Sequence, residues 1–233
     1  MAALPLHREI EYPESDGRPL GETDWHREEI VDLIYALDQR YRDAPDVYVS
    51  GNLLLYYVEG DTSKSICPDV LLVEGVSKEK RPIYKLWVEK RPPSLVIEMA
   101  SKSTWPEDLA DKMAIYARIG VTEYFLFDPV GLYLHPSLQG FRLTRGGYRS
   151  IEPARDGSMI SEVTGLRLQV EGQKLRLVDL VSGEKLLRTN EERAAREAAE
   201  ARMAAERSAR EAAEEEVRRL RRELDALGSA GKL

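Results

Sequence analysis

The chain has 233 residues, of which 42% are hydrophobic and 32% charged, a composition that allows one globular core and excludes a fibre or a short peptide. The formal net charge of −7 excludes a surface that attracts nucleic acid or an anionic membrane as a whole, so any nucleic-acid site needs a local basic patch. The single cysteine, Cys67, excludes an internal disulfide, and with only three scattered histidines it also excludes a Cys/His metal cluster.

The sequence pattern shows neither a membrane-spanning helix nor a signal peptide. No apolar run approaches the roughly 20 residues that a membrane-spanning helix needs. The first residues lack the basic and apolar regions of a signal peptide. We therefore expect a soluble protein of the reducing cytoplasm that does not associate with membranes.

The first predicted elements are a helix and a set of strands. Apolar residues recur with helical spacing along Asp24–Arg42, and Thr23 before them is a suitable N-cap. Four extended segments follow, each rich in Val, Leu, Ile and Tyr and bounded by Gly, Pro, Asp or Ser. They are Asp46–Ser50, Asn52–Val58, Val70–Glu74 and Ser94–Met99.

A second helix is predicted after the last of these strands. Thr104 and Glu107 have the spacing of a capping box, Pro106 stands in the first turn, and Gly120 ends the helical pattern. The next segment, Glu123–Phe127, is nearly continuously apolar, which is typical of a strand buried on both faces.

Strand, helix and strand in this order predict a βαβ crossover, with residues 95–98 and 124–127 parallel in one sheet. From Gly131 to Gly183 short extended segments alternate with glycine-rich turns, which predicts hairpins packed on the edge of that sheet.

The composition changes near Thr189. From there to Leu227 the chain is almost entirely Ala, Glu and Arg without Gly or Pro, which predicts one helix of about 39 residues and about 58 Å. The positive and negative charges of this tail nearly cancel, so most of the net charge belongs to the preceding residues. Its apolar stripe is mostly alanine and becomes a possible seam only in the last turns, at Val217, Leu220, Leu224 and Leu227. Two alternatives for this tail therefore stay open: a coiled coil that self-associates, and a single solvated helix.

Two acidic residues stand at the ends of apolar strands. Asp69 opens the strand that begins at Val70, and Glu98 lies near the end of the strand over residues 94–98. A carboxylate at a buried strand end costs several kcal/mol in lost hydration unless it is paired or binds a metal. Two such groups that converge would favour Mg²⁺ or Mn²⁺, which prefer oxygen ligands. The alternative is structural, with Asp69 capping a turn after Pro68 and Glu98 paired with an arginine.

A lysine accompanies these acids. Lys112 lies at the edge of the apolar stripe of the second predicted helix, from which it could reach over the sheet toward Glu98. The alternative is an exposed pair with Asp108, four residues earlier.

Several of these segments together carry a family resemblance. They are Pro68-Asp69, Leu95–Ser101, Asp108, Lys112 and Tyr116–Pro129. This pattern resembles the Uma-two endonuclease family, a branch of the PD-(D/E)XK restriction-endonuclease-like superfamily. The resemblance spans about residues 17–187, and its most specific stretch is Glu98–Pro129. It divides the chain into an N-terminal extension (1–16), a nuclease-like domain (17–187) and a C-terminal helix (188–233).

The resemblance implies a restriction-endonuclease-like α/β/α core with a mixed β-sheet, followed by the long C-terminal helix. It further implies Mg²⁺-dependent, or Mn²⁺-dependent, cleavage of phosphodiester bonds. Asp69 and Glu98 would bind the metal, with the backbone carbonyl of Met99 as a further ligand. In the basic superfamily pattern a lysine stands two residues after the acid, where this chain has Ala100. The family pattern implies that Lys112 has taken over that role.

The first helix offers a further metal ligand. A third acidic ligand from this helix is plausible in the superfamily, and Glu29, four residues before Leu33 on the core-facing side, is the candidate that we prefer to Glu28. Ser101 and Ser103 could bind the phosphate, but we expect them to form a turn.

A local basic patch lies between the two acidic strands, in the segment from Lys78 to Arg91. Its six basic and two acidic residues are interleaved with aromatic rings, which suits a groove that follows a nucleic-acid backbone. The residues expected to contact nucleic acid are Lys78, Lys80, Arg81, Lys85, Trp87, Lys90 and Arg91. A solvated hairpin with Trp87 packed inward is the alternative.

Three hypotheses follow. The first is a metal-dependent endonuclease that acts on nucleic acid, DNA rather than RNA, and forms a homo-oligomer through the C-terminal helix or the nuclease-like domain. The second is a catalytically silent nuclease fold that works as a binding or scaffold module through that helix. The third is a metal-dependent phosphatase or phosphodiesterase for a small substrate, which would use the same carboxylates and would not need residues 78–91.

Overall fold

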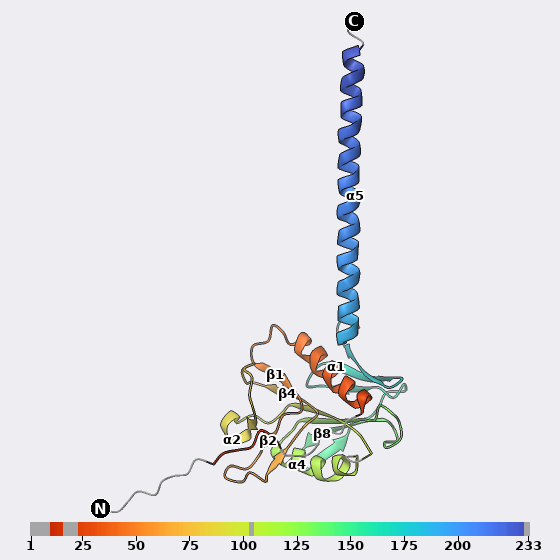
Figure 1. Cartoon of the computed structure of the whole chain (residues 1–233). Coiled ribbons are helices and arrows are strands. Elements are labelled where there is room, and N and C mark those ends of the chain that lie inside the picture. Colours follow the sequence, from red (N-terminus) through yellow and green to blue (C-terminus); the bar gives the residue numbers. More distant parts are fainter. Residues whose placement is uncertain (1–9, 16–22, 103–104, 231–233) are drawn as a thin grey trace, which may run out of the picture. The chain divides into compact units, whose positions relative to one another are not determined.

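The computed structural model describes residues 10–15, 23–102 and 105–230, with only the backbone described at 107, 108 and 223–230. Its residues group into two compact units, Met1–Arg188 and Thr189–Leu233. The first unit carries the sheets and the shorter helices, and the second consists of a single helix, α5 (Thr189–Ala230) (Figure 1).

A six-stranded mixed sheet forms the centre of the first unit, in the order β1-β4-β6-β7-β8-β9. These strands are β1 (Val47–Ser50), β4 (Val70–Glu74), β6 (Leu95–Met99), β7 (Glu123–Phe127), β8 (Leu138–Thr144) and β9 (Gly147–Ser150). β6 and β7 are parallel, and the other neighbouring pairs are antiparallel. The mixed α/β fold class predicted from the sequence is confirmed.

The parallel pair is joined by a helical crossover. It consists of α3 (Trp105–Glu107), a π-helical segment η1 (Asp108–Lys112) and α4 (Met113–Ile119). The predicted βαβ unit is confirmed, but the expected uninterrupted α-helix is wrong, because η1 has the wider turns of a π-helix. Thr104, the predicted cap, lies outside the described residues. Gly120 ends α4 in the left-handed region (φ 91°), which glycine adopts without steric cost.

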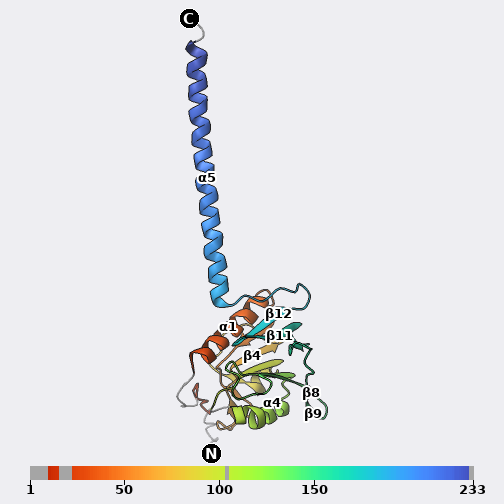
Figure 2. The same ribbon diagram turned by 90° about the vertical axis from the view of Figure 1, so that its right-hand side faces the viewer.

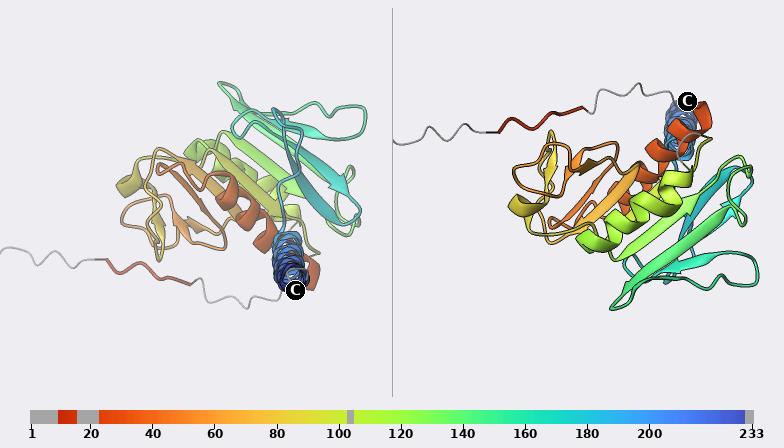
Figure 3. Two further views of the ribbon diagram at one scale, coloured as in Figure 1. Left: turned by 90° about the horizontal axis from the view of Figure 1, so that it is seen from above. Right: turned by 90° about the horizontal axis from the view of Figure 1, so that it is seen from below.

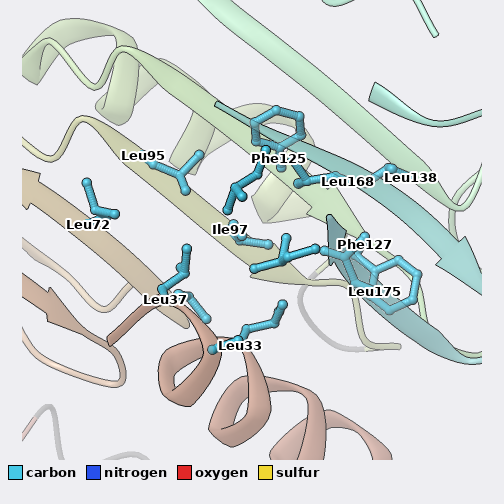
Figure 4. Close-up of a cluster of buried hydrophobic side chains, with 14 of the residues drawn as sticks. Leu33, Leu37, Leu72, Leu95, Ile97, Phe125, Phe127, Leu138, Leu168 and Leu175 are labelled. Atoms are coloured by element: carbon cyan, nitrogen blue, oxygen red, sulfur yellow. The ribbon is translucent and has the colours of Figure 1, made fainter. Parts of the chain in front are cut away.

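α1 (Asp24–Arg40) covers one face of the six-stranded sheet. The Thr23 side chain accepts the backbone N–H of His26 at 3.3 Å, so the predicted N-cap is confirmed. Leu33 and Leu37 point from this helix toward Ile97 and Phe127 of the sheet (Figure 4). Burying each such leucine stabilises the fold by about 1.5–3 kcal/mol.

α4 covers the opposite face, so α1 (red-orange) and α4 (yellow-green) enclose the sheet between them (Figure 3). Side chains of consecutive strand residues point to alternate faces. In β6, Ile97 therefore packs in the cluster on the α1 side, whereas Val96 packs with Tyr116 of α4. By the same alternation Glu98 faces α4.

The segment after β9 departs from the prediction. Only β8 and β9 extend the edge of the main sheet, as expected for a hairpin. The later strands form a separate antiparallel sheet, namely β10 (Met159–Ser161), β11 (Leu166–Glu171) and β12 (Lys174–Asp179). This sheet lies beside α1 (Figure 2), and its buried apolar residues belong to the same hydrophobic cluster as those of α1.

A third, small sheet lies between β1 and β6 in the chain. It contains β2 (Leu55–Tyr56), β3 (Ser65–Ile66) and β5 (Tyr84–Lys85), and α2 (Leu86–Glu89) follows directly. The strand predicted over Asn52–Val58 is thus limited to two residues. β5 pairs in parallel with β2, so the segment from Lys78 to Arg91 is not a hairpin.

α5 has 42 residues, about 63 Å, and every side chain from Glu192 to Arg222 is exposed. Ion pairs between residues three or four apart, such as Arg196–Glu200 at 2.8 Å, run along its surface. Such exposed pairs contribute only about 0.3–0.5 kcal/mol each. In the described part of the chain, neither α5 nor another helix has the length and apolar character needed to cross a membrane.

Candidate metal and nuclease site

Asp69, directly before β4, and Glu98, within β6, lie at the same end of the main sheet. β4 and β6 are antiparallel, with Val70 opposite Ile97. One step further along the same register places Asp69 opposite Glu98. Both residues are buried, Glu98 at 0% and Asp69 at 9% exposure. The structure therefore brings together the two carboxylates that the sequence singled out.

Glu98 is held by two donors from the helical crossover. The Lys112 Nζ atom lies 2.9 Å from Oε2, and the Tyr116 hydroxyl donates to Oε1 at 2.5 Å. Lys112 and Tyr116 are four residues apart, so they occupy one face of the helix above the sheet. Lys112 reaches Glu98 as the helical spacing indicated. The Asp108 side chain, its alternative partner, lies outside the described residues.

Ala100 occupies the position where the basic superfamily pattern has a lysine. It is 3% exposed and packs in the hydrophobic cluster on the α4 side of the sheet. The ammonium group next to Glu98 comes instead from Lys112, whose side chain retains 19% exposure.

Asp69 is oriented by α1 and by β6. Its Oδ2 atom accepts the backbone N–H of Met99 at 2.7 Å and lies 3.4 Å from Nε2 of His26. Burial alone would raise the pKa of Asp69. The contact with His26, the charge of Lys112 and the Met99 N–H outweigh burial and hold this pKa below its ordinary value of 3.8.

Tyr116 stays protonated in this environment. Burial, followed by the charge of Glu98, raises the pKa of Tyr116 well above 10. The phenol is therefore protonated at neutral pH, donates a hydrogen bond to Glu98 and fixes one carboxylate oxygen.

Gly51 allows the chain to pass close to Asp69. A Cβ atom at position 51 would lie 2.0 Å from the backbone oxygen of Asp69 and 2.6 Å from Cδ1 of Ile34. Next to it, the Asn52 N–H donates to the Pro68 carbonyl at 2.9 Å. The absence of a side chain at position 51 thus lets this loop support the start of β4.

Glu29 does not join this site. Its Oε2 atom accepts the Leu175 N–H at 3.0 Å, and its carboxylate forms a buried ion pair with Arg188, which also contacts Asp32 at 2.7 Å. The structure thus assigns Glu29 to a buried charge cluster between α1, β12 and the segment before α5. The expectation that it binds the metal fails because the helix turns Glu29 toward β12, whereas His26 is the α1 residue that reaches Asp69.

His26 and Tyr116 belong to the site although the sequence pattern did not single them out as functional. His26 lies on the buried stripe of α1 with Ile30, Leu33 and Leu37, at spacings of four, three and four. A polar residue on such a stripe signals a buried partner. The sequence pattern puts Tyr116 on an apolar stripe, which suits its ring, but its hydroxyl needs a hydrogen-bond acceptor when it is buried.

Several basic groups of the segment 78–91 are engaged within the protein. Arg81 pairs with Glu89 at 2.6 Å and stands 4.5 Å from the Tyr48 ring centroid, and Lys85 stands 4.6 Å from that of Tyr12. Lys78 donates to the backbone carbonyl of Tyr41. Trp87 packs 5.2 Å from the Tyr12 ring. Nucleic-acid contact by this segment stays a prediction, as it does for Lys80, Lys90 and Arg91.

The donor set suits a hard divalent cation. Mg²⁺ commonly takes one or two carboxylates and completes its shell with water and substrate phosphate. Among the described residues no group of three or more His, Cys, Asp or Glu side chains is arranged to hold a metal ion. Asp69 and Glu98, with a backbone carbonyl such as that of Met99, are thus compatible with Mg²⁺ or Mn²⁺ bound largely by water and substrate, and not with a closed structural site.

One family model matches most of this chain. A family model with the description "Putative restriction endonuclease", Uma2, matches residues 2–176. Among solved structures, the crystal structure of "a putative nuclease belonging to DUF820" from Anabaena variabilis is similar, with 14% sequence identity, 61% of this chain and 75% of that chain covered, and a TM-score of 0.45. The search of curated proteins finds no significant match.

Proposed function

Because the chain belongs to the Uma2 family of putative restriction endonucleases, we propose that it is a Mg²⁺-dependent endonuclease that hydrolyses phosphodiester bonds of DNA in the cytoplasm. The observation that supports this proposal is the buried pair Asp69 and Glu98 at adjacent strand ends, with the Lys112 ammonium 2.9 Å from Glu98. Mn²⁺ would serve in place of Mg²⁺, since both prefer oxygen ligands.

The residues of the chain have distinct roles in this mechanism. Asp69, Glu98 and the Met99 carbonyl would hold the cation, which when bound supplies an activated water and offsets charge on the phosphate. His26 and the Met99 N–H fix Oδ2 of Asp69. Lys112, with part of its side chain exposed, orients the attacking water and stabilises the negative charge that develops on the phosphate.

The test is cleavage of plasmid DNA by the full chain with Mg²⁺ or Mn²⁺. Asp69→Asn and Glu98→Gln should each lower the nicking rate by more than about 100-fold, because each removes a charged metal ligand. Lys112→Met should lower it by about 100- to 1000-fold through loss of transition-state stabilisation. Nicking would be followed by gel electrophoresis, with folding checked by circular dichroism.

Glu162→Gln is a matched control, because Glu162 is 70% exposed and pairs with Arg142 in a different acidic cluster. This variant should cleave at the native rate. If the native chain cleaves neither DNA nor RNA, single-stranded or duplex, with either metal, the proposal is wrong.

One observation favours a second candidate, a catalytically silent binding module with a nuclease fold. Both carboxylate oxygens of Glu98 already receive donors, from Tyr116 and Lys112. If these contacts persist, the pocket is a closed ion pair and not a metal site. Titration calorimetry with Mg²⁺ and Mn²⁺ separates the candidates: a metal site binds and raises the unfolding temperature, and a silent module does neither.

A further inference from the structure

Two of the three tryptophans expose their rings next to the candidate site. Trp25 is 53% exposed and Trp105 is 36% exposed, whereas the third, Trp87, packs on Tyr12. Tryptophan is enriched where proteins bind partners, because its ring offers a large apolar face together with a polar N–H group. Their positions indicate what they could bind.

Trp25 stands at the rim of the site on the α1 side. It directly precedes His26, whose imidazole lies 3.4 Å from Asp69. Consecutive residues of an α-helix point about 100° apart. When His26 is directed inward to Asp69, the neighbouring Trp25 is therefore turned out of the core, in agreement with its exposure.

Trp105 lies near the end of β6, where the crossover toward α4 begins. Its backbone N–H donates at 3.1 Å to the carbonyl of Ser101, three residues beyond Glu98. Seven residues further along the crossover, Lys112 contacts Glu98. α1 and α4 cover opposite faces of the sheet, so Trp25, on α1, and Trp105, at the start of the crossover that leads to α4, belong to elements on opposite sides of the carboxylates.

The charges near these rings are mixed: Asp24, Glu28 and Asp111 are exposed, and two lysines are placed to meet a phosphate backbone. Lys102, between Ser101 and Trp105 in the crossover, is exposed, and Lys112 retains part of its surface. Basic groups that follow a phosphate backbone, combined with aromatic rings on which bases stack, are typical of surfaces for unpaired nucleic acid. The segment 78–91 is less suited, because Arg81, Lys85 and Trp87 contact Glu89, Tyr48 and Tyr12.

We infer that Trp25 and Trp105 stack unpaired nucleobases on either side of the carboxylates, so that the substrate is single-stranded or locally unpaired nucleic acid. This inference rests on the proposed function and narrows its substrate class. In an intact duplex each base is already stacked between its neighbours and offers no free face to an indole.

The experiment measures binding apart from cleavage. Fluorescence anisotropy with a labelled single-stranded DNA oligonucleotide, and with its duplex, is recorded for the full chain in EDTA. The native chain should bind the single strand more tightly, with quenching of its indole emission. Trp25→Ala and Trp105→Ala should each weaken single-strand binding by about 5- to 150-fold and leave duplex binding unchanged.

Matched variants separate stacking from folding. Trp25→Phe and Trp105→Phe keep an aromatic face and should retain most of the affinity. Leu132→Ala removes another exposed apolar side chain, 70% exposed in the loop after β7, and should bind as the native chain does. If an alanine variant fails to fold, the phenylalanine variants and the quenching of native emission decide the result.

Two outcomes would overturn the inference: equal affinity of the native chain for single strand and duplex, or folded alanine variants that bind the single strand like the native chain. If cleavage by the native chain persists in either case, the proposed function survives and only the stacking role is lost. A native chain that cleaves no nucleic acid contradicts the proposed function itself.

Discussion

Glu98 is a charged residue fully enclosed at the end of an otherwise apolar strand. Removing a carboxylate from water costs several kcal/mol, and the fold offsets this with the Lys112 ammonium and the Tyr116 hydroxyl. Asp69 is compensated in the same way by His26 and the Met99 N–H. Each acid has donors from a helix or from a neighbouring strand, so the pair is held in one geometry before any ligand arrives.

At the scale of single residues, we predict that His26 orients the carboxylate of Asp69. His26→Leu should lower the affinity for Mn²⁺ by about 10- to 100-fold, because the carboxylate loses its partner on α1. His26→Gln should retain most of the affinity, since the Gln amide can donate from a position close to that of Nε2. Electron paramagnetic resonance of Mn²⁺ without nucleic acid measures this. Equal losses in both variants, with unchanged folding, would contradict the orienting role.

The lowered pKa of Asp69 also predicts how the stability of the folded chain decreases at acidic pH. Its pKa is lower in the folded chain than its ordinary value of 3.8, so the ionised carboxylate contributes stability above about pH 4. That contribution is lost as the pH falls through the folded pKa. Urea unfolding between pH 2 and 6 without metal should show a smaller loss of stability on acidification for Asp69→Asn than for the native chain. Parallel curves would show that Asp69 does not titrate as described.

At the scale of elements, α1 carries two different polar contacts on its buried side. His26 reaches the site, whereas Glu29 and Asp32 bind Arg188 just before α5. On the opposite face, the π-helical turn of η1 ends at Lys112, and Tyr116 follows within α4. The site therefore depends on how α1 and the crossover sit against the sheet end.

Glu29 is predicted to be structural. Glu29→Gln should reduce the free energy of unfolding by about 3 kcal/mol, since it weakens a buried ion pair with Arg188. Its affinity for Mg²⁺ should not change. Urea unfolding and titration calorimetry test the two parts, with exposed Glu162→Gln as a control that should cost under about 1 kcal/mol. A loss of Mg²⁺ affinity as large as that of Asp69→Asn would return Glu29 to the metal site.

At the scale of the whole molecule, the two units have different sources of stability. The first unit buries apolar clusters on both faces of its main sheet. α5 exposes every side chain from Glu192 to Arg222, including Val217 at 47% and Leu220 at 45%. A long helix without a buried face gains little stability from packing, and a second helix along such apolar positions would supply it.

We therefore predict that the full chain forms a homodimer through α5. Ending the chain after Arg188 should leave the unfolding temperature of the first unit unchanged and convert the dimer to a monomer, as measured by differential scanning calorimetry and light scattering. A full chain that remains monomeric at all accessible concentrations would show that α5 is a solvated single helix. A shortened chain that still dimerises would place the interface in the first unit.

The sequence by itself determined the elements whose signals are local. Periodicity and caps located α1, the apolar runs located β4, β6 and β7, and their order required a parallel pair. The positions of Asp69 and Glu98 at strand ends could be read in the same way. Local pattern did not show that β10–β12 form their own sheet, because apolar alternation does not reveal which surface a strand covers.

Only the tertiary structure decided the partners of buried charges. Whether Glu29 or His26 reaches Asp69 depends on the rotation of α1 against the sheet and on Arg188, 159 residues away from Glu29. The outward position of Trp25 depends on the same rotation. These relations arise from contacts between residues distant in the chain, and no spacing within one element encodes them. The sequence supplied the two acids and the lysine, and the packing of α1 and α4 on the sheet gave them their partners.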